Sequence, residues 1–136
     1  MTYIEKCLFF YQSNLYSLHL LRQKKRELKS IHSTSYIATA EICSPSDPVA
    51  DTVSKKLSIE KKIKKLKKLV DGVIKLKADL SGEAFTMRQM SFILEHKYIR
   101  HKGNEKTREL MHVSWSTFWR RNRALLHFAE KYFSQE

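Results

Sequence analysis

Long stretches of the chain carry apolar residues at helical spacing and contain little that would interrupt a helix. Only three glycines and two prolines occur among the 136 residues, and residues 2–30 and 113–133 contain neither. Side chains three and four positions apart lie on one face of a helix, so apolar residues at that spacing predict amphipathic helices. We therefore predict an all-α fold, with a long coiled-coil-like helical hairpin in residues 1–82 and a compact three-helix module in residues 83–136.

The first arm of the predicted hairpin covers residues 2–30. Its apolar positions alternate four and three residues apart, the spacing of a heptad seam: Ile4, Leu8, Tyr11, Leu15 and Leu18. The basic cluster at residues 22–29 near the end of this arm either contacts phosphate or is a solvated face that complements the helix dipole. We favour the solvated face.

The second arm is predicted over residues 49–80, with at most a slight bend at Gly72, where glycine costs about 1 kcal/mol relative to alanine. Its apolar stripe consists of Val53, Ile59, Ile63, Leu66, Val70, Val73 and Leu80. The stripe needs a partner, which is either the first arm of the same chain or a second copy of the protein. The sequence therefore leaves open a monomer, a homodimer or a higher homo-oligomer.

Residues 31–48, between the two arms, are rich in serine and threonine and hold both prolines, and this composition predicts a linker. Three apolar residues indicate that the linker partly docks on the helices: Tyr36, Ile37 and Ile42. Asp47 followed by Pro48 predicts an N-cap and a first-turn proline for the second arm.

The chain has 26 Lys and Arg against 14 Asp and Glu, a formal net charge of +12. This balance favours a polyanionic partner, nucleic acid first and an anionic membrane surface second. Part of the charge lies on a lysine face opposite the apolar stripe of the second arm: Lys61, Lys64, Lys65 and Lys68. These lysines either add phosphate contacts or keep a coiled coil soluble.

Several classes of protein are disfavoured by what the sequence lacks. No apolar run is long enough for a membrane span and the first residues lack a signal-peptide pattern, so we expect a cytoplasmic protein. Cys7 and Cys43 form no CxxC pair, and only His96 and His101 come near ligand spacing, so neither a disulfide nor a metal site is expected. Without a glycine-rich phosphate loop or paired carboxylates, we expect neither enzymatic activity nor a cofactor.

The C-terminal module is predicted to begin with a helix whose apolar face packs on the last helix: Phe85, Met90, Ile93, Leu94 and Tyr98. A turn at residues 101–104 follows. There, Gly103 is expected to be left-handed, and Asn104 is expected to cap a short helix through Met111.

The last predicted helix follows Ser114, a favourable N-cap residue. One face is apolar, at Phe118, Leu125, Ala129 and Tyr132, and the opposite face carries Ser116, Arg120, Arg123 and His127. Because guanidinium groups fork onto phosphate or guanine, we interpret this face as a DNA-reading surface. The alternative is an ordinary amphipathic helix with solvated arginines.

The candidate DNA contacts are the polar, aromatic and basic residues of this helix: Ser114, Trp115, Ser116, Thr117, Trp119, Arg120, Arg121, Arg123 and His127. Candidate phosphate contacts elsewhere are Lys102, Lys106, Lys61 and Lys65.

The run HVSWSTFWRRNRALLHFAEKYF, preceded by an apolar helix that ends in HKYI, resembles the C-terminal module of the ArpU/RinA family of phage late transcription regulators. That module is similar to region four of sigma factors. The resemblance extends more loosely over the whole chain. It implies a helix-turn-helix activator of late phage genes that acts with host RNA polymerase on double-stranded DNA in the bacterial cytoplasm. It places Ser116, Thr117 and Arg120 where such helices face DNA.

The chain departs from the general helix-turn-helix pattern at two positions. Arg108 stands where a small residue is usual in the first helix, and His112 stands where a glycine is usual in the turn. We therefore expect different local packing there. A second interpretation from another class is a structural packaging protein, such as a small terminase-like subunit that assembles into a ring and binds packaging-site DNA through the same module.

Overall fold

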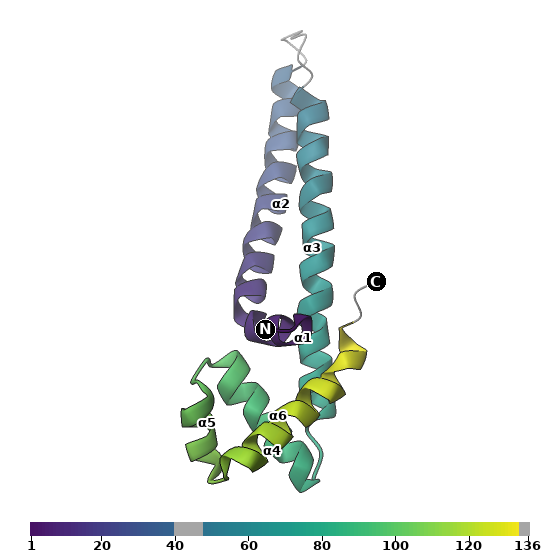
Figure 1. The fold of residues 1–136 in the computed structure, drawn as a ribbon. Coiled ribbons are helices and arrows are strands. Elements are labelled where there is room, and N and C mark those ends of the chain that lie inside the picture. The colour runs from purple at the N-terminus through teal and green to yellow at the C-terminus, as the bar shows by residue number, and fades with distance from the viewer. Residues whose placement is uncertain (40–47, 134–136) are drawn as a thin grey trace. The chain divides into compact units, whose positions relative to one another are not determined.

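The computed structural model describes the backbone of residues 1–39 and 48–133, and the side chains of residues 1–28 and 53–133. Within these ranges the protein is all-helical, as predicted, and contains no strand (Figure 1). None of the helices described is both long and apolar enough to cross a membrane. The predictions for Tyr36, Ile37, Ile42, Cys43 and the Asp47 cap concern side chains outside the described residues.

The described helices form two units. One unit contains Met1–Asn14 together with Lys68–Glu136, and the other contains Leu15–Lys67. Each of the two longest helices, α2 (Tyr11–Thr39) and α3 (Pro48–Asp79), contributes to both units. The predicted domain boundary at residue 82 falls inside the first unit.

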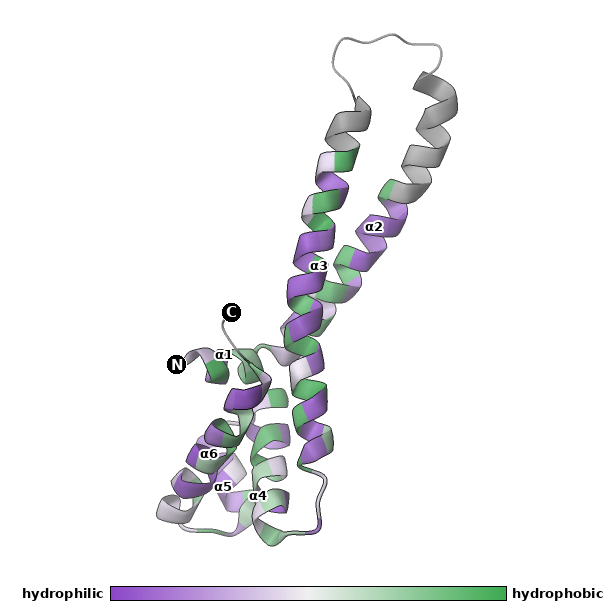
Figure 2. Ribbon diagram, turned by 90° about the vertical axis from the view of Figure 1, so that its right-hand side faces the viewer, coloured by the Kyte–Doolittle hydropathy of each residue, from purple (hydrophilic) through white to green (hydrophobic). Residues whose placement is uncertain are grey.

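The Leu15–Lys67 unit pairs the longer part of α2 with the first part of α3 (Figure 1). Lys25 Nζ lies 3.4 Å from a carboxylate oxygen of Glu60, which links the two helices. Leu18 is buried, whereas Leu15 of the same predicted seam is exposed. In Figure 2 hydrophilic and hydrophobic residues alternate in short runs along α3, as its helical spacing predicts.

The linker prediction needs correction at its beginning. Helix α2 continues to Thr39, so residues 31–39 are helical although they were predicted as linker. The start of α3 at Pro48 agrees with the predicted first-turn proline.

The prediction of one helix over residues 2–30 is wrong at Phe10. Helix α1 (Tyr3–Phe9) ends there, with φ −93° and ψ 17° at Phe10, and α2 starts at Tyr11. Thr2 caps α1 and forms a capping box with Glu5. The break follows from packing, because α1 buries Cys7 and Leu8 against the C-terminal helices. Burial also raises the pKa of the Cys7 thiol.

The unit that contains the C-terminus has its own hydrophobic core. The last part of α3 is followed by α4 (Phe85–Ile93), the π-helical η1 (Leu94–Ile99), α5 (Asn104–Met111), α6 (Trp115–Ala129) and the 3-10 turn η2 (Glu130–Tyr132). Helix α6 packs against α4 and α1, and α1 also contacts η1. The largest fully buried side chains of this unit are Tyr98, Phe118, Leu8, Leu76, Leu80, Ile93, Leu94 and Leu125.

Two predictions for the start of this module fail. Phe85 was assigned to the apolar face but is 69% exposed, because it is the first residue of α4 and lies outside the core. Asn104 is the first residue of α5, not its cap, and Gly103 occupies the cap position without a side-chain hydrogen bond. Thr107 Oγ1 donates to the Gly103 carbonyl at 2.7 Å. Gly103 has the positive φ predicted for it, 86°, but its ψ of 164° lies outside the left-handed helical region.

Gly72 lies inside the continuous helix α3, and its lack of a side chain makes room for Phe133. A Cβ at this position would lie 2.6 Å from Phe133 Cε1. Phe133 is 5% exposed and belongs to the core. Glycine is therefore required here for close approach, not for a bend.

We expect Gly72→Ala to lower the free energy of unfolding by about 1 to 3 kcal/mol through overpacking against Phe133. Without the clash, alanine would stabilise the helix by about 1 kcal/mol. Urea denaturation of Gly72→Ala, Phe133→Ala and the double variant measures both effects. In the Phe133→Ala background the same substitution should become stabilising. A more stable Gly72→Ala single variant would contradict the packing seen here.

Glu95 connects α3 to the end of η1. One carboxylate oxygen lies 3.3 Å from Lys77 Nζ and the other 3.0 Å from Arg100 Nε. Burial acts to raise the pKa of Glu95, but the hydrogen bonds and charges of Lys77 and Arg100 outweigh burial and hold it below its ordinary value of 4.5. The two cations are about half exposed, so the network contributes about 1 kcal/mol or less.

A lowered carboxyl pKa in the folded state stabilises the protein above the unfolded-state pKa, and this stabilisation is lost as pH falls through the folded-state value. We therefore expect Glu95→Gln to be less stable than the parent at neutral pH and equal to it at strongly acidic pH. Denaturation at a series of pH values measures the difference, with Glu83→Gln as the control for net charge. A difference that stays constant down to strongly acidic pH would show that the ion pairs do not cause it.

Candidate nucleic-acid interface

Helix α6 begins where the sequence predicts. Ser114 is extended, with φ −72° and ψ 163°, and its Oγ accepts a hydrogen bond from the Thr117 amide at 3.3 Å. This bond satisfies one of the amide groups that lack a partner in a first helical turn. The Ser114 cap is therefore confirmed.

The predicted apolar face of α6 is buried. Phe118, Leu125 and Ala129 have no exposed surface, whereas Tyr132 is half-buried and belongs to η2. Asn122, which the sequence reading did not single out, lies on the same buried face and is 6% exposed. Burial of this face fixes which residues of α6 meet solvent.

The opposite face is basic and lacks carboxylates. Between Trp115 and Ala129 the helix has three arginines and no Asp or Glu. The exposed candidates are Ser114, Trp115, Ser116, Trp119, Arg120, Arg123 and His127. Thr117 and Arg121 are half-buried. The structure thus brings most of the predicted contacts onto one accessible face.

Arg121 has a structural contact that sequence spacing did not indicate. Its Nε donates to Gln89 Oε1 at 2.6 Å, which joins α6 to the buried Gln89 of α4. One of its donors is therefore already engaged within the protein.

The far end of α6 is less basic than its start. His127 Nδ1 lies 3.6 Å from a carboxylate oxygen of Glu130, and both side chains are largely exposed. The basic face is therefore strongest around Arg120 and Arg123.

The connection between α5 and α6 accounts for both departures from the general pattern. His112 is left-handed, with φ 57° and ψ 43°, a conformation that glycine adopts most easily. Arg108 Nη1 donates to the Val113 carbonyl at 3.2 Å, and the guanidinium lies 4.7 Å from the centroid of the Trp115 ring. Arg108 thus stabilises the turn through a hydrogen bond and an aromatic contact that a smaller side chain could not make.

The two tryptophans are neighbours on the outer surface of α6. The ring centroids of Trp115 and Trp119 are 6.2 Å apart, and their planes are inclined by 21°. Each side chain is 43% exposed. The Lys97 ammonium lies 5.2 Å from the Trp119 centroid, so a cation flanks each indole: Arg108 at Trp115 and Lys97 at Trp119.

Sequence reasoning missed a polar cluster beneath α6. The Asn122 side-chain oxygen accepts hydrogen bonds from the Tyr98 hydroxyl at 2.7 Å and from Lys97 Nζ at 3.3 Å. Burial, opposed by Glu5, lowers the pKa of Lys97, and burial raises the pKa of Tyr98. The available signal was an asparagine at a position of α6 where helical spacing requires a buried residue.

The predicted phosphate-contacting lysines are all exposed. Lys102 lies in the turn before α5 and Lys106 lies on α5, in the same unit as α6. Lys61 and Lys65 lie on α3 in the other unit. Among the residues described, no cluster of three or more His, Cys, Asp or Glu side chains is arranged to hold a metal ion.

Comparison of the chain with protein-family models, curated proteins and solved structures found no match.

The left-handed turn at His112 makes a specific prediction. In a left-handed position glycine is favoured over alanine by about 1 kcal/mol, whereas inside a continuous helix alanine is favoured by a similar amount. We expect His112→Gly to be more stable than His112→Ala, which urea denaturation of the two variants measures. The reverse order would mean that α5 and α6 are not separated by this turn.

Proposed function

We propose that the protein binds double-stranded DNA through the exposed face of α6 and acts as a sequence-specific transcription regulator. The observation that carries the proposal is the composition of that face. Arg120, Arg123 and Ser116 are exposed on a helix whose other face is buried, and the helix contains no carboxylate that would repel phosphate.

The size of α6 supports entry into the major groove. Its 15 residues extend over about 22 Å, and the groove is about 12 Å wide, which admits one helix. The short α5, the left-handed His112 and the capped α6 follow the order of a helix-turn-helix. In that motif the first residues of the second helix contact base edges, which corresponds to Ser116, Trp119 and Arg120.

Phosphate contacts are assigned to the lysines that precede α6. Lys102 and Lys106 are exposed in the same unit and would orient the module on the duplex, while Arg120 and Arg123 select the base sequence. Lys61 and Lys65 are proposed as additional, non-specific contacts.

The regulatory part of the proposal rests on the resemblance to the ArpU/RinA family. It implies an activator that acts with host RNA polymerase in the bacterial cytoplasm. Footprinting on a promoter with and without bacterial RNA polymerase tests this part separately, since polymerase should extend or strengthen a protected site. If polymerase leaves the footprint unchanged, the role of activator is lost while DNA binding stands.

We expect Arg120→Ala and Arg123→Ala each to weaken binding to a selected duplex by about 1 to 3 kcal/mol, roughly fivefold to more than a hundredfold, and to relax sequence preference. The target duplex is first obtained by selection from a random library. Fluorescence anisotropy at several salt concentrations then measures the affinity.

Two further variants make this test specific. Arg88→Ala removes an exposed arginine of α4 and controls for the loss of one charge. Lys102→Met should weaken binding to all sequences alike and reduce the salt slope by about 0.9. If the two α6 variants bind like Arg88→Ala, α6 does not read the DNA.

A further inference from the structure

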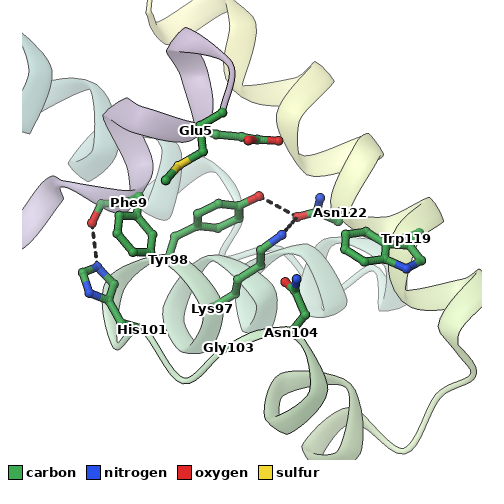
Figure 3. A pocket seen from close by; sticks show the side chains of 10 residues that line it. Glu5, Phe9, Lys97, Tyr98, His101, Gly103, Asn104, Trp119 and Asn122 are labelled. Carbon is green, nitrogen blue, oxygen red and sulfur yellow. Dashed lines mark hydrogen bonds between the residues drawn. The ribbon is translucent and has the colours of Figure 1, made fainter.

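A pocket of about 540 Å³ lies beside α6, within the unit that contains the C-terminus (Figure 3). Its lining comes from the N-terminal residues through α1, η1, the turn before α5, the first residue of α5, and α6. Small-molecule sites typically have volumes of about 300 to 1,000 Å³, with apolar walls and a few converging polar groups. Both the size and the lining of this pocket fit that description.

Two opposite charges line the pocket. Lys97 is half-buried, and its ammonium lies 4.8 Å from the Tyr98 ring centroid and 5.2 Å from that of Trp119. Among the described residues it donates one hydrogen bond, to Asn122, which uses one of the three ammonium hydrogens. Glu5 lines the pocket from α1, and in the part of the chain described here it forms no ion pair with Lys97. One Glu5 oxygen accepts a hydrogen bond from the Thr2 amide of the capping box, so the other oxygen and two donors of Lys97 remain for a ligand.

The walls between the charges are aromatic. The indole of Trp119 is 43% exposed. On another side, the Phe9 ring stacks on His101 with centroids 4.0 Å apart and planes inclined by 3°. The His101 ring nitrogen Nε2 lies 2.6 Å from the Phe9 carbonyl oxygen, which holds this wall in place. Flat walls of this kind suit a flat ring, which they contact by stacking.

A polar atom without a partner also borders the pocket. The side-chain oxygen Oδ1 of Asn104 is buried and accepts no hydrogen bond from the residues that the structure describes. In Figure 3 the Asn104 side chain points from the start of α5 towards Lys97. Because this oxygen has almost no accessible surface, it forms part of the pocket wall beside Lys97 and offers no direct contact to a ligand.

We propose that this pocket binds a small zwitterion that carries a flat ring, the chemistry of an aromatic amino acid. The carboxylate pairs with Lys97, the ammonium pairs with Glu5, and the ring contacts Trp119. A simple anion such as phosphate fits less well, because the Glu5 carboxylate lines the same pocket.

A bound ligand would contact the helix that carries the proposed DNA-reading face, because Trp119 and Asn122 both belong to α6 and both line the pocket. This consequence rests on the proposed DNA binding, whereas ligand binding itself does not. If the two sites are coupled, the ligand changes DNA affinity by the same factor as DNA changes ligand affinity.

Ligand binding is tested on the full protein without DNA. The probes are L-phenylalanine, L-tyrosine and L-tryptophan at millimolar concentration, and the readouts are titration calorimetry and the thermal unfolding temperature. Because a ligand that binds only the folded state stabilises it, at least one of the three should bind and raise the unfolding temperature. Failure of all three overturns the proposal, whatever happens with DNA.

Three analogues test the chemistry on the unmodified protein. Phenethylamine lacks the carboxylate, 3-phenylpropionate lacks the ammonium, and L-alanine lacks the ring. Each should bind at least about tenfold more weakly than L-phenylalanine, because each leaves one charge or one wall without its partner. Equal binding of any analogue would overturn the part of the assignment that it tests.

Variants locate the site. Lys97→Met should abolish the preference for L-phenylalanine over phenethylamine, whereas Lys75→Met, which removes an exposed lysine of α3, should keep it. Asn104→Ala provides a second probe of the pocket if Lys97→Met does not fold. In the Trp115→Phe protein the remaining indole, Trp119, should change its fluorescence on addition of L-phenylalanine. Binding that survives both pocket variants and leaves Trp119 unaffected would place the ligand elsewhere and refute the pocket.

Discussion

Burial of one face of α6 is the constraint on which the rest of this unit depends. Phe118, Leu125 and Ala129 have no exposed surface, and a helix so anchored cannot rotate without exposing them. At about 25 cal/mol per Å² of apolar surface, such a rotation would cost several kcal/mol. The outward orientation of Arg120 and Arg123 therefore follows from packing.

The hydrogen bonds of Asn122 also restrict the position of α6. Asn122 lies among the buried residues of α6 and is satisfied there by Tyr98 and Lys97 of η1. An unpaired amide at this depth would cost about 1 to 3 kcal/mol, so rotation or sliding of α6 is penalised by lost hydrogen bonds as well as by lost apolar contact. Apolar packing selects the buried face of α6, and the Asn122 contacts select its position along the axis.

Sequence spacing predicted the helical class, the start of α6 at Ser114, and the division of α6 into buried and exposed faces, because these are local properties of a 3.6-residue repeat. Sequence spacing failed to predict the features that depend on contacts between residues far apart in the chain. No glycine or proline marks the break at Phe10, which follows from burial of Cys7 and Leu8. The engagement of Arg121 with Gln89 joins residues 32 positions apart, and the pocket gathers residues from both ends of the chain. No local pattern encodes such distances.

The position of Trp119 ties these features together. Trp119 follows the buried Phe118 directly, so the packing of Phe118 fixes the direction in which the partly exposed indole of Trp119 points. It stacks near Trp115 on the outer surface and meets Lys97 at the border of the pocket. A molecule that contacts Trp119 from the pocket touches an indole that also lies against Trp115 and Phe118 of α6. Such a molecule therefore contacts α6 directly, the helix that carries the exposed Arg120 and Arg123.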